Sequence, residues 1–203
     1  MNTKNPFDVK GIGITTPKGK ALWCRNVIPD RQFDKEGTLS TSLVLDPSDK
    51  EVQAFLEPLE AMLEDAYKQT LESLGPVKSK GIDKAPITKP DTDKDGNDTG
   101  MIKINLKLGK IDSRKAEGKQ FEINTVDAKK NKITNPPTVG NGSTIRCSGF
   151  AFPYYAAALK KVGISILWNG LQIVELTGSG TGSDFGEEEG FTIGSINDSE
   201  VPF

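Results

Sequence analysis

One stretch of this 203-residue chain has apolar residues at the spacing of a helix, and most of the remainder consists of short segments in which apolar and polar residues alternate. That stretch is residues 49–74, opened by Ser48, because Glu51 follows three residues later as in a capping box. Pro58 is expected to kink or divide the helix. The apolar positions recur every three or four residues, so this stripe is predicted to pack against a core rather than to hold a cofactor.

The other segments alternate apolar and polar residues with a period of two, as strands do. In residues 101–111, the isoleucines and leucines are predicted to face a core and the lysines to face the other side. In residues 20–28, Leu22 and Cys24 should share one face, with Trp23 and Arg25 on the other. Further strands are predicted over residues 38–46, 121–127, 143–152 and 163–177. This order favours a small antiparallel barrel, closed or partly open, with one packed helix.

A polar insertion over residues 75–100 separates the helix from the strand that follows, and a loop of this length is usually functional or mobile. Within it, Asp91, Asp93, Asp95 and Gly96 resemble the start of a calcium-binding loop. Ile102 stands where that loop needs a bidentate glutamate, so the run is predicted to be a solvated hairpin tip.

The chain contains no histidine, which excludes serine–histidine and cysteine–histidine nucleophiles and most zinc sites. Its two cysteines, Cys24 and Cys147, sit within apolar strands and are predicted to be buried thiols. No apolar run is long enough to span a membrane, and no signal peptide is recognisable at the start. We therefore expect a cytoplasmic protein that is not an enzyme and holds no metal or cofactor.

Charge is divided unevenly along the chain. Residues 178–203 carry six carboxylates and no lysine or arginine, whereas residues 1–177 carry all 26 basic residues against 22 acidic ones. A Gly-rich linker followed by like charges is predicted to be a disordered tail. Its end places a Pro-Phe pair beside the terminal carboxylate, which suits docking into a partner's pocket. A basic body with an acidic tail suggests that the body binds a polyanion.

Basic side chains interleave with aromatic ones on the predicted strands. Single-stranded nucleic acid needs this combination, because cations track the phosphates and rings stack on unpaired bases. The alternative is that each aromatic ring lies in the core and each lysine on an ordinary solvated face. The candidate nucleic-acid-binding residues are Trp23, Arg25, Lys103, Lys107, Arg146, Phe150, Phe152, Tyr154 and Tyr155.

Several of these segments resemble the phage single-stranded DNA-binding family, which has an OB-fold core. The matching segments are residues 23–29, the strand 38–46 with its Asp-Pro helix start, the turn 140–143 before a basic strand, and residues 163–166 and 171–176. The tip is similar to the acidic Pro-Phe end of bacterial single-stranded DNA-binding proteins. The candidate partner-binding residues are Asp198, Glu200, Val201, Pro202 and Phe203.

The resemblance implies an OB-fold-like, partly open barrel over residues 1–177, followed by a linker and a partner-binding tail over residues 178–203. It implies a protein that coats single-stranded DNA without sequence specificity during phage replication and recombination, in the host cytoplasm. The tail would recruit a polymerase, helicase, primase or nuclease, and self-association is a further expectation.

Two other classes of protein are alternatives to this function. A structural or interaction protein would use the tail only for solubility. A metal-dependent nuclease would use Asp91, Asp93, Asp95 and Asp98, but two-metal hydrolysis needs carboxylates held at converging positions.

Overall fold

The computed structural model describes residues 6–32, 37–108 and 122–177. The predicted disorder of the acidic tail falls outside these residues.

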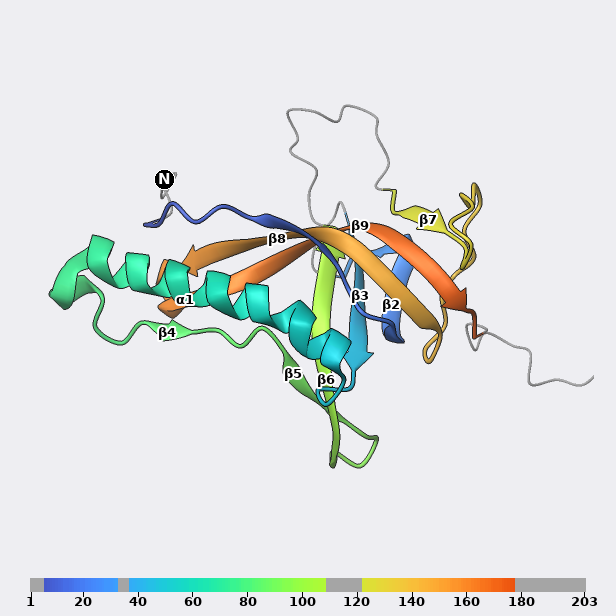
Figure 1. Ribbon diagram of the computed structural model, residues 1–203, viewed down its shortest axis with the longest axis horizontal. Coiled ribbons are helices and arrows are strands. Elements are labelled where there is room, and N and C mark those ends of the chain that lie inside the picture. Colours follow the sequence, from blue (N-terminus) through green and yellow to red (C-terminus); the bar gives the residue numbers. More distant parts are fainter. Residues whose placement is uncertain (1–5, 33–36, 109–121, 178–203) are drawn as a thin grey trace, which may run out of the picture.

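Five strands form the body of the molecule (Figure 1). In spatial order they are β2 (Gly19–Asp30), β3 (Thr38–Leu45), β6 (Asp98–Leu108), β9 (Lys161–Glu175) and β8 (Thr144–Ala156), and β8 pairs again with β2. The β6–β9 junction is parallel and has one registered residue pair, Lys107 with Leu167, whereas the other junctions are antiparallel. A five-stranded, partly open barrel is the architecture of the OB-fold. The predicted fold class is therefore confirmed, although one junction is parallel.

Shorter elements extend this barrel. They are β1 (Ile12–Thr15), which pairs with β8; β4 (Asp83–Lys84) and β7 (Asn124–Val126), which pair with β9; and β5 (Lys89–Thr92), which pairs with β6. A 3-10 turn, η1 (Ala157–Leu159), connects β8 to β9.

The one long helix of the described ranges, α1 (Lys50–Lys78), lies beside β8 and β9 (Figure 1). Its N-cap is Asp49, whose Oδ1 accepts the backbone N–H of Glu51 at 2.8 Å. The prediction of Ser48 as the cap was wrong, because the Ser48 hydroxyl donates to Asp46 instead. The helical backbone is interrupted at Gly75, which has a φ of 70°, and not at Pro58.

The core lies between α1 and the inner face of the barrel. Val52, Phe55 and Leu59 supply the helix side, as their spacing predicted. Trp168 is completely buried among them, and its indole N–H donates to the carbonyl oxygen of Gly170 at 2.9 Å. A buried indole needs such a partner, since an unsatisfied polar group would destabilise the fold.

Both cysteines are buried free thiols, as predicted. Burial raises the pKa of Cys24 to about 11, and it raises the pKa of Cys147 as well. Burial has this effect because a thiolate loses its hydration in an apolar interior.

A second, smaller core lies near the C-terminal half of α1 and includes Leu63, Ala66, Ile82 and Val162. Ile82 belongs to the 75–100 insertion, so this polar segment is anchored to the body. At its far end, β5 and β6 form a hairpin, and the Asp93 carboxylate accepts the backbone N–H groups of Asp95 and Asn97. The predicted hairpin tip is therefore confirmed. No helix in the described ranges is long and apolar enough to cross a membrane.

Candidate nucleic-acid interface

A row of residues crosses the outer face of the barrel from one strand to the next. Arg25 pairs with Ser40, Ser40 with Lys107, Lys107 with Leu167, and Leu167 with Phe150. Residues directly opposite one another on neighbouring strands project from the same face of the sheet. Ser40 is half-buried and the other four are exposed. The row therefore presents two cations, a hydroxyl and two apolar side chains across four junctions.

Aromatic rings continue from this row along β8. Phe150 and Phe152 are 43% and 37% exposed, whereas the intervening Ala151 is fully buried. Sequence alone left the exposure of these two rings open. Tyr154, the next residue on the same side, lies against Gly163 on β9, where a β-carbon would come within 2.5 Å of the tyrosine Oη. Glycine at this position lets the ring lie close to the strand.

Among the aromatic side chains that the structure describes, that of Trp23 is the most exposed, at 64%. Its φ of 49° lies in the left-handed region, which is unusual for a residue other than glycine. The pairing of β2 with β3 shifts register between Leu22 and Arg25, so a bulge turns this ring outward. The Oδ1 atom of Asn141 accepts the backbone N–H of Trp23 at 2.7 Å and holds the bulge.

Because of this bulge, β2 does not follow the predicted alternation of buried and exposed residues. The buried residues of β2 are Ala21, Cys24 and Asn26, so the first two are three positions apart, while Leu22 is only half-buried. The predicted exposure of Trp23 and Arg25 holds, although simple alternation is not the cause.

Lys103 lies beside the Trp23 ring, with its Nζ atom 5.8 Å from the ring centroid. The same Nζ atom is 3.2 Å from Oδ1 of Asp91 on β5, and both side chains are largely shielded from solvent. A shallow depression adjoins this cluster and is lined by Trp23, Ser40, Thr41, Ser42, Asn105, Leu106 and Lys107. Hydroxyl, amide and ammonium groups around an exposed indole suit a phosphodiester chain with unpaired bases.

Two of the candidate residues lie away from this cluster. Tyr155 packs on the second core with Val162 as its strand partner, so it belongs to the inner side of β8. The Nε–H of Arg146 donates to the carbonyl oxygen of Thr16 at 3.1 Å, and Arg146 lines a shallow pocket with Glu51 and Phe55 of α1. The structure therefore brings together seven of the nine residues on strands β2, β6 and β8. The candidate tail residues, Asp198 and 200–203, lie outside the described ranges.

Sequence patterns did not single out four further residues of this face: Ser40, Ser42, Asn105 and Leu167. The first three stood on the predicted polar sides of their strands, which was the available signal. Leu167 was missed because an apolar residue beside Trp168 looks like core until the register with Phe150 is known.

The carboxylates of residues 91–98 contact different partners and do not converge on one point. Asp91 pairs with Lys103, Asp93 closes the hairpin turn, and Asp98 accepts the backbone N–H of Gly100 at 2.8 Å. Hydrogen bonds, chiefly from Asn97, hold the pKa of Asp93 below its usual value. Among the described residues, no group of three or more His, Cys, Asp or Glu side chains could hold a metal ion.

The family model described as the single-stranded DNA-binding protein of bacteriophage T7 matches residues 23–176. Among solved structures, gp2.5, a single-stranded DNA-binding protein encoded by bacteriophage T7, matches with a TM-score of 0.64 and 21% identity, over 90% of this chain and 99% of that one. The single-stranded DNA-binding protein of bacteriophage Enc34, in complex with ssDNA, matches with a TM-score of 0.50 and 11% identity, over 82% and 88% of the two chains. No curated protein sequence matches.

Proposed function

We propose, because the chain belongs to the family of the bacteriophage T7 single-stranded DNA-binding protein, that it binds and coats single-stranded DNA without sequence specificity. The observation that carries the proposal is the outer row from Arg25 to Phe150, which combines cations with exposed apolar and aromatic side chains. Double-stranded DNA hides the base faces that such rings would stack on. The Enc34 protein, which has a similar fold, was solved with ssDNA.

Two kinds of contact would contribute to the binding free energy. Lys107 and Arg25 would contact phosphates, releasing counterions, so affinity should fall steeply with salt. Trp23, Phe150 and Phe152 would stack on bases, a term worth roughly 1–3 kcal/mol per base that tolerates any sequence. None of these contacts reads a base edge, which supports binding without sequence preference.

A fluorescence titration with oligothymidylate tests the proposal. The chain has two tryptophans, and Trp168 is fully buried, so quenching should report on Trp23 alone. Lys107→Ala should weaken binding and reduce the slope of log Kd against log salt by about 0.7, the single-strand value for one phosphate contact. Lys78→Ala, at the end of α1, is the matched control. Absence of quenching at low salt, or equal affinity for duplex DNA, would contradict the proposal.

The acidic tail is proposed to recruit replication and recombination proteins of the phage, in the cytoplasm of the infected cell. The support is its composition: six carboxylate side chains without a counter-charge, together with the adjacent Pro202 and Phe203. A truncated protein, residues 1–177, should bind single strands at least as tightly as the full chain, because an acidic competitor has been removed. It should also fail to capture a replication polymerase, helicase, primase or nuclease. Loss of DNA binding on truncation would refute this part.

We propose no catalytic step for this chain. Incubation of labelled single-stranded oligonucleotide with the protein and magnesium or manganese should leave it intact. Cleavage that is lost in Asp93→Asn would instead favour the nuclease alternative.

A further inference from the structure

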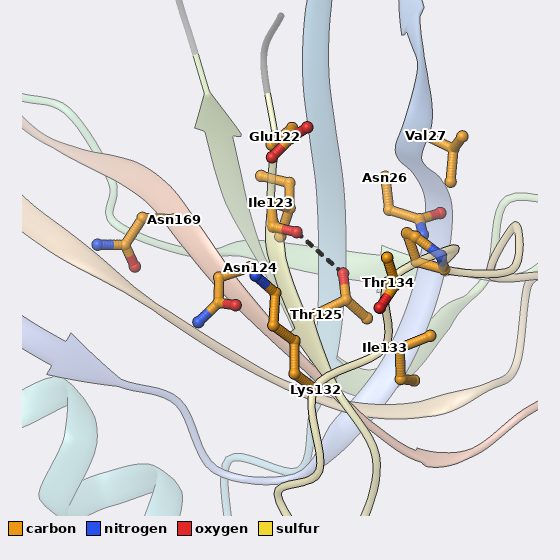
Figure 2. Close-up of a pocket in the computed structure, with 11 residues that line it drawn as sticks. Asn26, Val27, Glu122, Ile123, Asn124, Thr125, Lys132, Ile133, Thr134 and Asn169 are labelled. Carbon is orange, nitrogen blue, oxygen red and sulfur yellow. Dashed lines mark hydrogen bonds between the residues drawn. The ribbon is translucent and has the colours of Figure 1, made fainter.

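A pocket of about 490 Å³ opens beside β7, outside the row already described (Figure 2). This volume lies within the range of about 300–1,000 Å³ that is usual for small-molecule sites. Its walls come from the end of β2, from β7 and the residues before it, from a loop, and from β9. The residues are Asn26, Val27, Glu122, Ile123, Asn124, Thr125, Lys132, Ile133, Thr134, Pro136 and Asn169.

The pocket lies two residues further along two strands of the outer row, β2 and β9. Val27 follows Arg25 by two residues on β2, and Asn169 follows Leu167 by two residues on β9. The side chains of all four residues are exposed. The hydroxyl of Ser148, two residues before Phe150, donates to Oδ1 of Asn169 at 3.3 Å. A strand of nucleic acid lying along the row would therefore reach the mouth of this pocket.

A bulge in β9 sets the position of Asn169. Gly149 is the partner of Trp168 and Ser148 is the partner of Gly170, so Asn169 is the extra residue. The two glycines make this close pairing possible, because a β-carbon at Gly149 would lie 2.0 Å from the carbonyl oxygen of Leu167 and one at Gly170 would lie 2.2 Å from Oγ of Ser148. Bulges commonly re-aim a side chain beside a functional site.

Two amide side chains offer hydrogen bonds at this pocket. Asn124 and Asn169 are exposed and lie on the same side of it (Figure 2). Among the described residues, the Asn124 amide has no hydrogen-bond partner, and Asn169 uses only its oxygen, with Ser148. An amide presents a donor and an acceptor together, which matches the edge of an unpaired base. Ile123, which is buried, and Ile133, which is half-buried, make part of the pocket wall apolar.

The charges of the pocket favour a base over a phosphate. Glu122 and Lys132 both line it, so the opposite charges offset one another. A phosphate drawn inside would meet the carboxylate of Glu122. A neutral ring avoids that repulsion, and its backbone phosphate would stay outside within reach of Lys132.

From these observations we infer that the pocket receives one unpaired nucleobase of the strand that lies along the outer row, held by the amides of Asn124 and Asn169. This inference rests on the proposed function. It adds to non-specific coating a fixed point at which the strand leaves the outer face of the barrel.

The test replaces each amide and measures oligothymidylate binding over a salt series. Asn124→Ala and Asn169→Ala should each weaken binding about two- to tenfold, the range for one lost hydrogen bond. The slope of log Kd against log salt should stay unchanged, since no phosphate contact is lost. Asn135→Ala, on the same loop as Thr134 and Pro136 but outside the lining, is the matched control and should bind as the unaltered protein does.

A second measurement on the unaltered protein keeps the test independent of folding defects in the variants. The side-chain amide NMR signals of Asn124 and Asn169 should shift when oligothymidylate is added, and that of Asn135 should not. Unshifted signals, or unchanged affinity in both variants while the unaltered protein binds, would overturn the inference. Thymidine monophosphate that binds as tightly as the oligonucleotide would also overturn it, by making the pocket a free-nucleotide site. A protein that binds no oligonucleotide at all would instead refute the proposed function.

Discussion

Trp23 combines high exposure with a backbone conformation that side chains other than glycine seldom adopt. The comparison that isolates this conformation is Trp23→Gly against Trp23→Ala, because both variants lose the indole. Both also keep the backbone N–H that Asn141 accepts. Only the response of the backbone to a β-carbon then differs between them.

In an ordinary strand, glycine is less stable than alanine by about 0.5–1 kcal/mol, since it loses more conformational freedom on folding. At a φ of 49°, alanine instead carries a penalty of about 1–2 kcal/mol, from which glycine is exempt. The two effects oppose each other. We therefore expect Trp23→Gly to be more stable than Trp23→Ala by about 0.5–1 kcal/mol, the reverse of the usual order.

Urea unfolding measures this difference directly. Trp168 remains as the single, buried tryptophan in both variants, so the same fluorescence change reports unfolding in each. Both variants should also lose about 5- to 150-fold in affinity for oligothymidylate, which corresponds to one stacked base at roughly 1–3 kcal/mol. If Trp23→Ala unfolds at the same or higher urea than Trp23→Gly, the left-handed bulge is not what exposes this ring.

Three further predictions follow from contacts elsewhere in the chain. Asp91→Asn should strengthen oligothymidylate binding about two- to fivefold, because it releases the ammonium of Lys103 from its ion pair, whereas Asp95→Asn at the hairpin tip should change nothing. Hydrogen bonds, chiefly from Asn131, hold the pKa of Asp127 below its usual value, so its contribution to stability is present above the unfolded pKa of about 3.9 and is lost as pH falls through the lower folded pKa. The difference in thermal midpoint between the unaltered protein and Asp127→Asn should therefore shrink below about pH 4. A difference that persists at pH 2 would refute this prediction. Cys24 and Cys147 should resist a thiol reagent at pH 8 until urea unfolds the protein, because burial raises the pKa of both thiols; rapid labelling of the native protein would contradict their burial.

The sequence predicted those parts of the fold in which local pattern and tertiary packing agree. The strand predicted at residues 38–46 differs from β3 by one residue, and the inward side of β6 follows its alternation. The helix was identified from its apolar stripe, but its cap was misplaced by one residue. Ser48 and Asp49 both suit a cap, and only the geometry of the chain leaving β3 decides between them.

The candidate site was harder to predict because its form depends on contacts between distant segments. The bulge at Trp23 is held by Asn141, and the bulge at Asn169 depends on glycines in both β8 and β9. The alternation of apolar and polar residues within one strand does not predict either bulge. The same limit explains Tyr155, since adjacent tyrosines on β8 project from opposite sides and only the register with β9 assigns each to its side.

The parallel junction between β6 and β9 has a consequence for how the barrel responds to its ligand. Lys107 and Leu167 are the registered pair at this junction, within the residues that the structure describes, and both belong to the outer row. A polynucleotide bound to both residues would bridge a strand junction that few backbone hydrogen bonds stabilise. Occupancy should then slow amide exchange along β6 and β9 more than along β2 and β3, whose junction has five registered pairs, so the ligand would stabilise the part of the barrel on which it lies.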